Sequence, residues 1–406
     1  MTDWKECKIA DLGTVIGGAT PSTKDPANYE NGTIAWITPK DLSTFTGRYI
    51  KRGERNITEI GLKSCSTQLL PANSVLFSSR APIGYIAIAA NEVCTNQGFK
   101  NVIPNDDTDP LFLYYLLKYN KDKIESMGSG TTFKEVSGNT MKGISVRVPK
   151  DISVQKRISS VLGMIDDKIE ENERINDNLA KTIKAVFKSW FLDFDAFDGV
   201  ELVQSQYGLI PNGWHYELLG NLCDCVTKGT TPTTLGKDFT DTGINFIKGE
   251  SINDDHSFNK TLFAHIDDET DELLKRSRIY VNDIVFTIAG TLGKFALVDS
   301  SVIPANTNQA VAIIRTSKIM PAMLYSYFIG EWQVEFYKRN TQQAVQANLS
   351  LGTIKDLPIL LPDSKGQDHY MQLVTPLIVG MQNNFSEIER LYELQNQLLA
   401  RLSSSR

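Results

Sequence analysis

The sequence contains an internal duplication with a step of about 210 residues, and this repeat limits the possible folds more than any other feature. Trp4 recurs as Trp214, and Thr95-Asn-Gln97 recurs unchanged as Thr307-Asn-Gln309. Further segments match in the same order: Ile9–Leu12 with Leu219–Leu222, Gly18–Pro21 with Gly229–Pro232, Ile34–Ile37 with Ile244–Ile247, Asn73–Ser78 with Asn282–Thr287, and Ile144–Pro149 with Leu357–Pro362. Solenoid repeats run only roughly 20–50 residues, so this step indicates a tandem duplication of a whole domain.

Each copy mixes strand and helix signals. Residues 74–79 and 283–288 are β-branched and aromatic runs that follow a turn at an asparagine, which predicts strands. Residues 110–118 and 321–329 begin at a proline and predict short helices. We therefore expect an α+β chain with two pseudo-symmetric α/β globules, in residues 1–151 and 201–365.

After each globule, apolar residues recur in alternating steps of four and three, the heptad pattern of a coiled coil. The first seam contains Ile158, Leu162, Ile165, Ile169, Asn172, Asn176, Leu179, Ile183, Val186 and Trp190. The second contains Val374, Ile378, Met381, Phe385, Ile388, Tyr392, Gln395, Leu399 and Leu402. This predicts one long helix in residues 152–200 and another in 366–406, with Pro376 tolerated in the first turns.

A narrow heptad seam requires a partner helix, and the two seams are the obvious partners for each other. Antiparallel pairing would separate the globules by a long two-helix coiled coil, in which Asn172, Asn176 and Gln395 fix the register. The alternative is one helix packed on the core of each globule. The aromatic run Phe187–Phe194 is expected to pack the domain junction or to form a docking surface.

Composition excludes several classes of protein. No apolar run reaches about 18 residues, and the first residues lack a signal-peptide pattern, so no membrane segment is expected. Five scattered cysteines are typical of a reducing cytoplasm. No phosphate-binding G-x-x-x-x-G-K-[ST] motif occurs, so no ATP-hydrolysing site is expected. The histidines are scattered along the chain, so no zinc site is expected either. The Asp166-Asp-Lys168 segment resembles part of a nuclease site, but its place on the heptad helix predicts a solvated face.

The order globule, heptad helix, globule, heptad helix resembles the specificity subunit of type I restriction–modification enzymes. Trp4 through Leu12, Gly18–Pro21 and the run Phe187–Phe194 carry the resemblance, which covers essentially the whole chain. Family members start each long helix with a Glu-Gln pair after a proline. Here Gln155 and Gln367 keep the glutamine, but the glutamate is absent.

The resemblance implies a division of labour within a complex. Each globule would be a target-recognition domain for one half of a split, asymmetric double-stranded DNA sequence. The coiled coil would set the spacing of the halves and dock two methyltransferase subunits, with restriction subunits joining the complex. S-adenosylmethionine, ATP and Mg²⁺ would then belong to the partners, and this chain would have no cofactor, no metal and no catalytic residue.

Charge is a test of this interpretation. Residues 1–150 have a net charge of +3, whereas residues 201–366 have a net charge of −5. DNA-binding domains usually carry a basic surface. We therefore expect the cations of the second globule to be concentrated on one face, and DNA binding by this chain alone to be weak.

Base recognition in the major groove uses Arg or Lys for guanine and Asn or Gln for adenine, presented on exposed loops. The candidates in the first globule are Lys40, Ser79, Arg80, Thr131 and Lys134, and those in the second are Lys248, Thr287, Lys294, Arg339, Gln342 and Gln343. A surface ion pair is the competing interpretation for Arg80, and a solvated side chain for each lysine. Because Thr95-Asn-Gln97 is identical in both copies, we expect it to form a structural turn.

Two other classes stay open at this point. One is a coiled-coil adaptor without DNA specificity, and the other is a nuclease or methyltransferase component with an unrecognised site. Sequence-dependent DNA binding would separate the specificity subunit from the adaptor, and metal-dependent cleavage by the chain alone would favour the nuclease.

Overall fold

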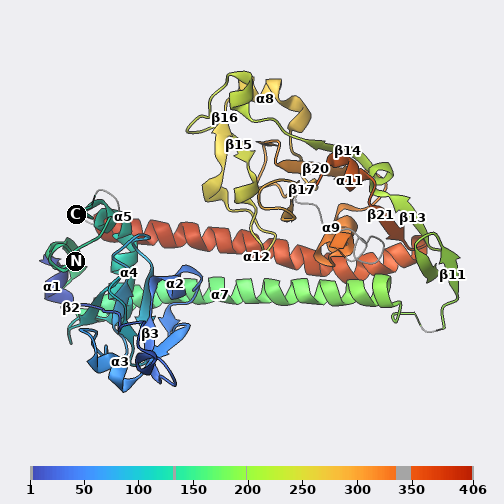
Figure 1. Ribbon diagram of the computed structural model, residues 1–406. Coiled ribbons are helices and arrows are strands. Elements are labelled where there is room, and N and C mark those ends of the chain that lie inside the picture. Colours follow the sequence, from blue (N-terminus) through green and yellow to red (C-terminus); the bar gives the residue numbers. More distant parts are fainter. Residues whose placement is uncertain (1–2, 131–133, 198, 335–348, 405–406) are drawn as a thin grey trace. The chain divides into compact units, whose positions relative to one another are not determined.

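The computed structural model describes residues 3–130, 134–197, 199–334 and 349–404, and the chain forms two compact units (Figure 1). Unit 1 comprises Met1–Glu171 together with Ile388–Arg406, and unit 2 comprises Asn172–Glu387. The unit boundaries therefore fall inside the two heptad segments, not at their ends.

Among its described residues, unit 1 forms three sheets. The five-stranded sheet has the order β2 (Gly13–Gly17), β9 (Lys100–Pro104), β6 (Val75–Phe77), β7 (Ile86–Ala89) and β4 (Tyr49–Ile50). The three-stranded sheet has the order β5 (Arg55–Ile57), β3 (Ile34–Ile37) and β8 (Cys94–Thr95), and β1 (Trp4–Lys8) pairs with β10 (Ser145–Pro149). The helices are α1 (Ile9–Leu12), α2 (Pro39–Ser43), α3 (Glu59–Lys63), α4 (Pro110–Tyr119), α5 (Lys121–Ser126) and α6 (Gly138–Gly143).

Unit 2 repeats this plan. Its four-stranded sheet has the order β14 (Cys223–Lys228), β20 (Val311–Thr316), β17 (Ile284–Thr287) and β18 (Phe295–Leu297). Its other sheets are β16 (Ala264–Ile266), β15 (Ile244–Ile247) and β19 (Ala305–Thr307); β13 (His215–Leu218) with β21 (Pro358–Leu361); and the hairpin β11 (Leu202–Ser205) with β12 (Gly208–Pro211). The short helices are α8 (Asp268–Leu273), α9 (Pro321–Ile329) and α11 (Leu351–Lys355).

The matched strands occupy the same places in both units, which confirms the α+β prediction for each copy. The order β2-β9-β6-β7 corresponds to β14-β20-β17-β18, and β5-β3-β8 corresponds to β16-β15-β19. Asn73 and Asn282 precede the central strands with φ of 69° and 72°, a left-handed conformation that asparagine tolerates better than most residues. Both predicted proline-initiated helices form, as α4 and α9.

The two long helices are α7 (Ile152–Lys188), which continues as a π-helix over Ser189–Asp193, and α12 (Ser364–Ser404). The glutamines near their starts have the same role, since Gln155 Nε2 donates to Pro149 O and Gln367 Nε2 donates to Pro362 O, at 3.1 and 2.9 Å. Pro376 lies well inside α12, not in its first turns as expected from the sequence. The helix continues although proline cannot donate the usual backbone hydrogen bond.

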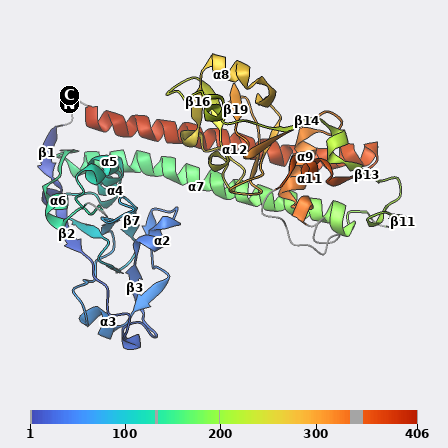
Figure 2. The ribbon, with the colours of Figure 1, turned by 45° about the horizontal axis from the view of Figure 1, so that its top comes forward.

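In unit 1, the first part of α7 contacts the last part of α12. Leu162 and Leu399 belong to one core with the five-stranded sheet and α4. Figure 2 also shows that sheet and α4 beside α7, with β3 and α3 farther away. Asp166 is only 8% exposed and accepts hydrogen bonds of 2.6 Å from Tyr115 Oη and Gln395 Nε2. The prediction of a solvated Asp166 was therefore wrong, because two buried polar partners satisfy its carboxylate.

In unit 2, the remaining parts of the helices pair in antiparallel sense. Asn172 Nδ2 donates to Glu387 Oε2 at 2.8 Å, and Asn176 Nδ2 donates to Met381 O at 3.2 Å. Asn384 Nδ2 in turn donates to Asn176 Oδ1 at 2.8 Å. As the residue number rises along α7, the number of the partner on α12 falls. Both asparagines thus bind across the helix pair at defined positions, as a register-fixing role requires.

The aromatic run after α7 packs inside unit 2. Phe187 and Phe191 are at most 1% exposed, and the Phe187 ring lies 5.0 Å from the rings of Phe191 and Tyr327. The Phe191 ring lies 5.5 Å from that of Trp214. Of the two expectations for this run, packing at a domain junction or a docking surface, the structure favours packing: the run joins the end of α7 to the core of unit 2.

Candidate nucleic-acid interface

A turn of identical construction follows β6 in unit 1 and β17 in unit 2. Ser78 N donates to Tyr85 O, and Thr287 N donates to Lys294 O, both at 2.8 Å. Gly84 N returns to Ser78 O, and Gly293 N returns to Thr287 O, both at 3.0 Å. The hydroxyls of Ser78 and Thr287 each accept the backbone N–H of Tyr85 and Lys294, respectively. The same backbone frame therefore presents different side chains in the two units.

The repeated Thr-Asn-Gln motif supports this frame. Asn96 Oδ1 accepts the N–H of Gly98 at 2.9 Å, and Asn308 Oδ1 accepts the N–H of Ala310 at 3.0 Å. Thr20 and Thr231, from the repeated Gly-x-Thr-Pro motifs, bond the side chains of Gln97 and Gln309. The prediction of a structural turn at this motif is confirmed.

The close approach of the Gly-x-Thr-Pro motif to the Thr-Asn-Gln motif explains why the first residue of the former is a glycine in both copies. A Cβ on Gly229 would lie 1.7 Å from Thr307 O, so any larger residue must displace the backbone. We expect Gly229→Ala to lower the free energy of unfolding by about 1–3 kcal/mol or more, through overpacking. Urea denaturation of the purified chain measures this loss. Gly143→Ala is the control, because a Cβ there meets nothing within 4 Å, and an equal loss in both variants would contradict the explanation.

Two sequence candidates prove to be part of the frame. Ser79 and Thr287 are fully buried. The Ser79 hydroxyl donates to Gly98 O at 3.1 Å, and the Thr287 hydroxyl bonds Thr291 O. The prediction that these two residues contact DNA is therefore wrong, because their hydroxyls bond the protein backbone and do not reach the surface.

Cations gather beside the turn of unit 1. Arg80, with its side chain 47% exposed, places Nε 3.0 Å from Glu135 Oε2. Lys100 Nζ lies 3.3 Å from Glu135 Oε1 and 3.4 Å from Ser79 Oγ. Lys134 is exposed next to Glu135 in the chain. Arg80 and Lys100 share one carboxylate, which leaves a local positive excess, and Lys134 adds a further cation nearby in the chain.

The pKa of Glu135 reflects these neighbours. Burial acts to raise it, but the hydrogen bonds and charges of Arg80 and Lys100 outweigh that effect and lower the pKa below its usual value. The competing prediction for Arg80, a surface ion pair, is thus confirmed, because Arg80 pairs with Glu135. It does not exclude DNA binding, because half of the Arg80 side chain stays exposed.

Lys40 lies at the start of α2, close to the same turn. The neighbouring Pro39 lies 3.0 Å from a Cβ built on Gly98, the residue that accepts two hydrogen bonds from Ser79. The Lys40 ammonium is 2.8 Å from Glu54, and both side chains are more than two-thirds exposed. An ion pair this exposed contributes little to stability, so the lysine stays available to another anion.

Unit 2 places two candidates beside its own turn. Lys294 Nζ lies 2.9 Å from Asp254 Oδ1, and Lys248 Nζ lies 4.7 Å from the centre of the Phe239 ring. A Cβ on the next residue, Gly249, would lie 3.5 Å from both Thr287 and Thr291. Lys248 and Lys294 therefore flank one turn. Thr131, Arg339, Gln342 and Gln343 lie outside the described residues.

Lys100 and Glu135 belong to this cluster but were not among the residues predicted from the sequence. Lys100 opens β9, three residues after Gln97 of the repeated motif, and its counterpart by strand register is Ala312 in β20. The sequence did contain a signal for Lys100, because a basic residue in one copy corresponds to alanine in the other. Glu135 gave none, because its approach to Arg80 depends on the fold between them.

A metal site or a membrane segment would indicate other chemistry, and neither is found in the parts of the chain that the structure describes. Within those ranges, no cluster of three His, Cys, Asp or Glu residues is arranged to hold a metal ion. The helices of the same ranges are all too short or too polar to cross a bilayer.

A family model for the type I restriction modification DNA specificity domain matches residues 1–181 and 211–389. One match falls on each copy of the repeat, and together they cover most of the chain. The chain belongs to the type I restriction–modification specificity subunits. As a specificity subunit, it serves DNA recognition, which the family favours over the adaptor and nuclease alternatives.

Individual specificity subunits match over nearly the full chain. The MjaIX specificity subunit of Methanocaldococcus jannaschii is 33% identical over 408 residues, which span 98% of this chain and 92% of the relative. The HindI specificity subunit of Haemophilus influenzae is 24% identical, over 99% of both chains. The crystal structure of a type I S subunit from M. genitalium superposes with a TM-score of 0.57 at 15% identity, over 100% of this chain and 97% of that one, and shows a shared fold.

Proposed function

We propose that each unit recognises one half of a split, asymmetric DNA target through the surface around its repeated turn. The observation that carries this proposal is a shared backbone frame with unlike charges. By the repeat, Arg80 of unit 1 corresponds to Ala289 of unit 2, and Lys100 corresponds to Ala312. Lys294 of unit 2 corresponds to Tyr85 of unit 1. Lys40 likewise corresponds to Glu250, and Lys248 to Thr38. Exposed loops on a common scaffold are where different specificities are expected.

The proposed domains are two recognition domains, residues 1–151 and 201–365, and two helices, residues 152–200 and 366–406. Together they would form two pseudo-symmetric globules separated by an antiparallel coiled coil. The cross-helix hydrogen bonds within each unit support this arrangement. The 37 residues of α7 extend over about 55 Å. That length is comparable to about 16 base pairs at 3.4 Å each, which suits recognition of two separated half-sites.

We further propose one docking site for a methyltransferase subunit in each unit. Val161 of α7 and Leu373 of α12 are equivalent by the 212-residue step of the helix-start glutamines, and they are 40% and 41% exposed. Met164 is 59% exposed beside a cavity of about 490 Å³ that Tyr49 and Leu111 also line. Exposed apolar groups on paired helices are typical of protein interfaces.

In this scheme the chain itself catalyses nothing. The methyltransferase subunits would bind S-adenosylmethionine, and restriction subunits would use ATP and Mg²⁺, in the cytoplasm where cellular DNA is reached. The net charge of −6 supports weak DNA binding by the chain alone, with further phosphate contacts supplied by its partners.

The test of DNA recognition uses opposite charge changes at one ion pair in the assembled methyltransferase complex. Arg80→Ala removes a candidate base or phosphate contact, and we expect it to weaken recognition by about 1–3 kcal/mol in one half-site only. Glu135→Gln frees Arg80 and Lys100 from their carboxylate and is expected to tighten DNA binding. DNA-binding titrations and genome-wide methylation maps measure both effects.

The matched control is Lys181→Ala, which removes an exposed helix cation paired with Asp177. If Arg80 has only a structural role, Arg80→Ala and Glu135→Gln will act in the same direction and neither will alter the methylated sequence. That pattern would reject the recognition surface. Cleavage of DNA by the chain alone with a divalent metal would instead favour a nuclease.

A further inference from the structure

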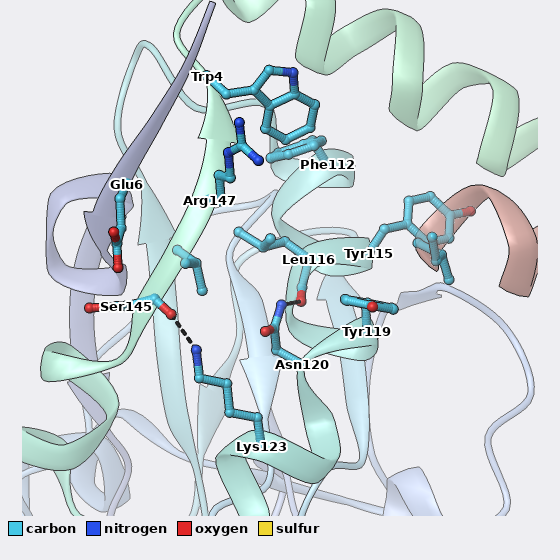
Figure 3. Close-up of a pocket in the computed structure, with 12 residues that line it drawn as sticks. Trp4, Glu6, Phe112, Tyr115, Leu116, Tyr119, Asn120, Lys123, Ser145 and Arg147 are labelled. Carbon is cyan, nitrogen blue, oxygen red and sulfur yellow. Dashed lines mark hydrogen bonds between the residues drawn. The ribbon is translucent and has the colours of Figure 1, made fainter. Parts of the chain in front are cut away.

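An open pocket in unit 1 lies between the β1–β10 pair and helix α4 (Figure 3). Its volume is about 390 Å³, within the range of pockets that bind ligands. Trp4, Phe112 and Leu116 form apolar parts of its wall, and Leu399 of α12 closes another part. Arg147 and Lys123 are the cations that line it, and Glu6 is the carboxylate.

The same place can be identified in unit 2 by strand register. Glu6 pairs with Arg147 across β1 and β10, and Tyr216 pairs with Leu360 across β13 and β21. The two pairs are equivalent by the sequence repeat, because Trp4 matches Trp214 and Ile144–Pro149 matches Leu357–Pro362.

In unit 2 this place is filled by aromatic side chains. Trp214 contacts the rings of Phe191, Phe194 and Phe197 at centroid distances of 5.5, 6.0 and 5.4 Å. These three residues belong to the segment that follows α7. The ring of Phe191 also lies 4.7 Å from that of Tyr327.

The residues that fill the site in unit 2 have smaller or polar counterparts in unit 1. Counting from the prolines that open α4 and α9, Leu116 corresponds to Tyr327. Counting from the glutamines that start the long helices, Leu399 corresponds to Phe187. Trp332 Nε1 donates to Pro358 O at 2.7 Å, whereas the matching carbonyl, Ser145 O, accepts from Lys123 Nζ at 2.7 Å.

We propose that the unit 1 pocket binds an aromatic side chain from an acidic segment of a partner protein. The occupant would take the place that Phe191–Phe197 hold beside Trp214. Its ring would lie against Trp4 and Phe112, since aromatic pairs are stabilised beyond their buried area. A partner is needed because Phe191 of a second copy is buried in that copy's own unit 2.

Charge complementarity indicates the acidic character of the occupant. Arg147 stands where unit 2 has Leu360, and Lys123 takes the position of the Trp332 indole, so two cations replace apolar groups. Glu6 offsets one of them. The corresponding segment of unit 2 carries Asp193 and Asp195 next to its aromatic residues. This inference is independent of the DNA-recognition surface, because it uses none of those residues.

The test uses the full chain and a fluorescent synthetic peptide with the sequence of residues 187–197. We expect saturable binding by anisotropy, and about tenfold or greater loss when both phenylalanines at peptide positions 191 and 194 become alanine. The double variant Leu116→Tyr with Leu399→Phe restores the unit 2 residues and should reduce binding by a similar factor. Arg147→Leu should weaken binding several-fold, and this exposed site keeps the test valid if the double variant does not fold.

Leu394→Phe, at a 45% exposed position of α12, is the matched control and should bind normally. A photo-crosslinking group at peptide position 191 should attach to residues 112–123. Attachment to unit 2 alone, or equal affinity in the pocket-filling variants, would overturn the proposal. So would self-association of the chain that the pocket-filling variants abolish, since this would assign the pocket to a second copy.

Discussion

Insertion of one heptad into both long helices is expected to lengthen the gap in the recognised DNA target by about three base pairs. The insertions belong between Glu171 and Asn172 and between Glu387 and Ile388, because Asn172 bonds Glu387 across the pair. One heptad adds about 10 Å of helix, and duplex DNA rises 3.4 Å per base pair. Methylation maps of cells that express the extended chain with its methyltransferase measure the gap.

The control for this prediction is the same heptad inserted into α7 alone. Unequal helices place Asn172 and Asn176 out of register with their partners on α12, so the pair loses hydrogen bonds and methylation should fall everywhere. An unchanged gap in the doubly extended chain would contradict the spacing role of the helices. The bases recognised in each half-site should stay the same.

The second large effect is expected from Phe187→Ala, which should lower the free energy of unfolding of unit 2 by about 3–5 kcal/mol. The Phe187 side chain is fully buried, and its ring lies 5.0 Å from Tyr327 and 6.1 Å from Trp332. Its removal leaves a cavity among rigid rings that cannot collapse easily. Tryptophan fluorescence in urea reports on this region, since Trp190, Trp214 and Trp332 all belong to or pack on its core.

Lys188→Ala tests the specificity of that effect, because the Lys188 side chain is next in sequence and 63% exposed. A loss within about 0.5 kcal/mol is expected for this surface change. If Phe187→Ala costs no more than Lys188→Ala, the aromatic core does not hold the end of α7 to unit 2.

Periodicity and repetition predicted the parts of the fold that depend on local pattern. The 210-residue repeat, the two heptad helices and the turn at Asn96 and Asn308 all follow from residues close together in the chain. The pairing of the helices was also inferable, because a two-position seam leaves apolar side chains in water unless another helix covers them.

The errors arose where distant residues decide the environment. The position of Asp166 beside the heptad seam predicts a solvated side chain, yet Tyr115 and Gln395 approach it from other elements. The sequence predicts Ser79 and Thr287 as polar groups at the surface, but both side chains are fully buried and bond backbone carbonyls brought to them by the fold. The cluster of Arg80, Lys100 and Glu135 joins three segments that only the tertiary fold brings together.

Unit 1 is built from two parts of the chain that the ribosome makes far apart in time. Its core includes Leu399, so residues 1–171 complete their fold only after residues 388–404 have been made, more than 200 residues later. At ribosomal speeds of roughly 5–20 residues per second, this delay is on the order of 10–40 s. During that time the apolar side chains of Leu162 and its neighbours lack their partner on α12, so they stay exposed to water unless a chaperone covers them. Production of this protein should therefore depend on elongation rate and chaperone supply more than the stability of either unit alone would suggest.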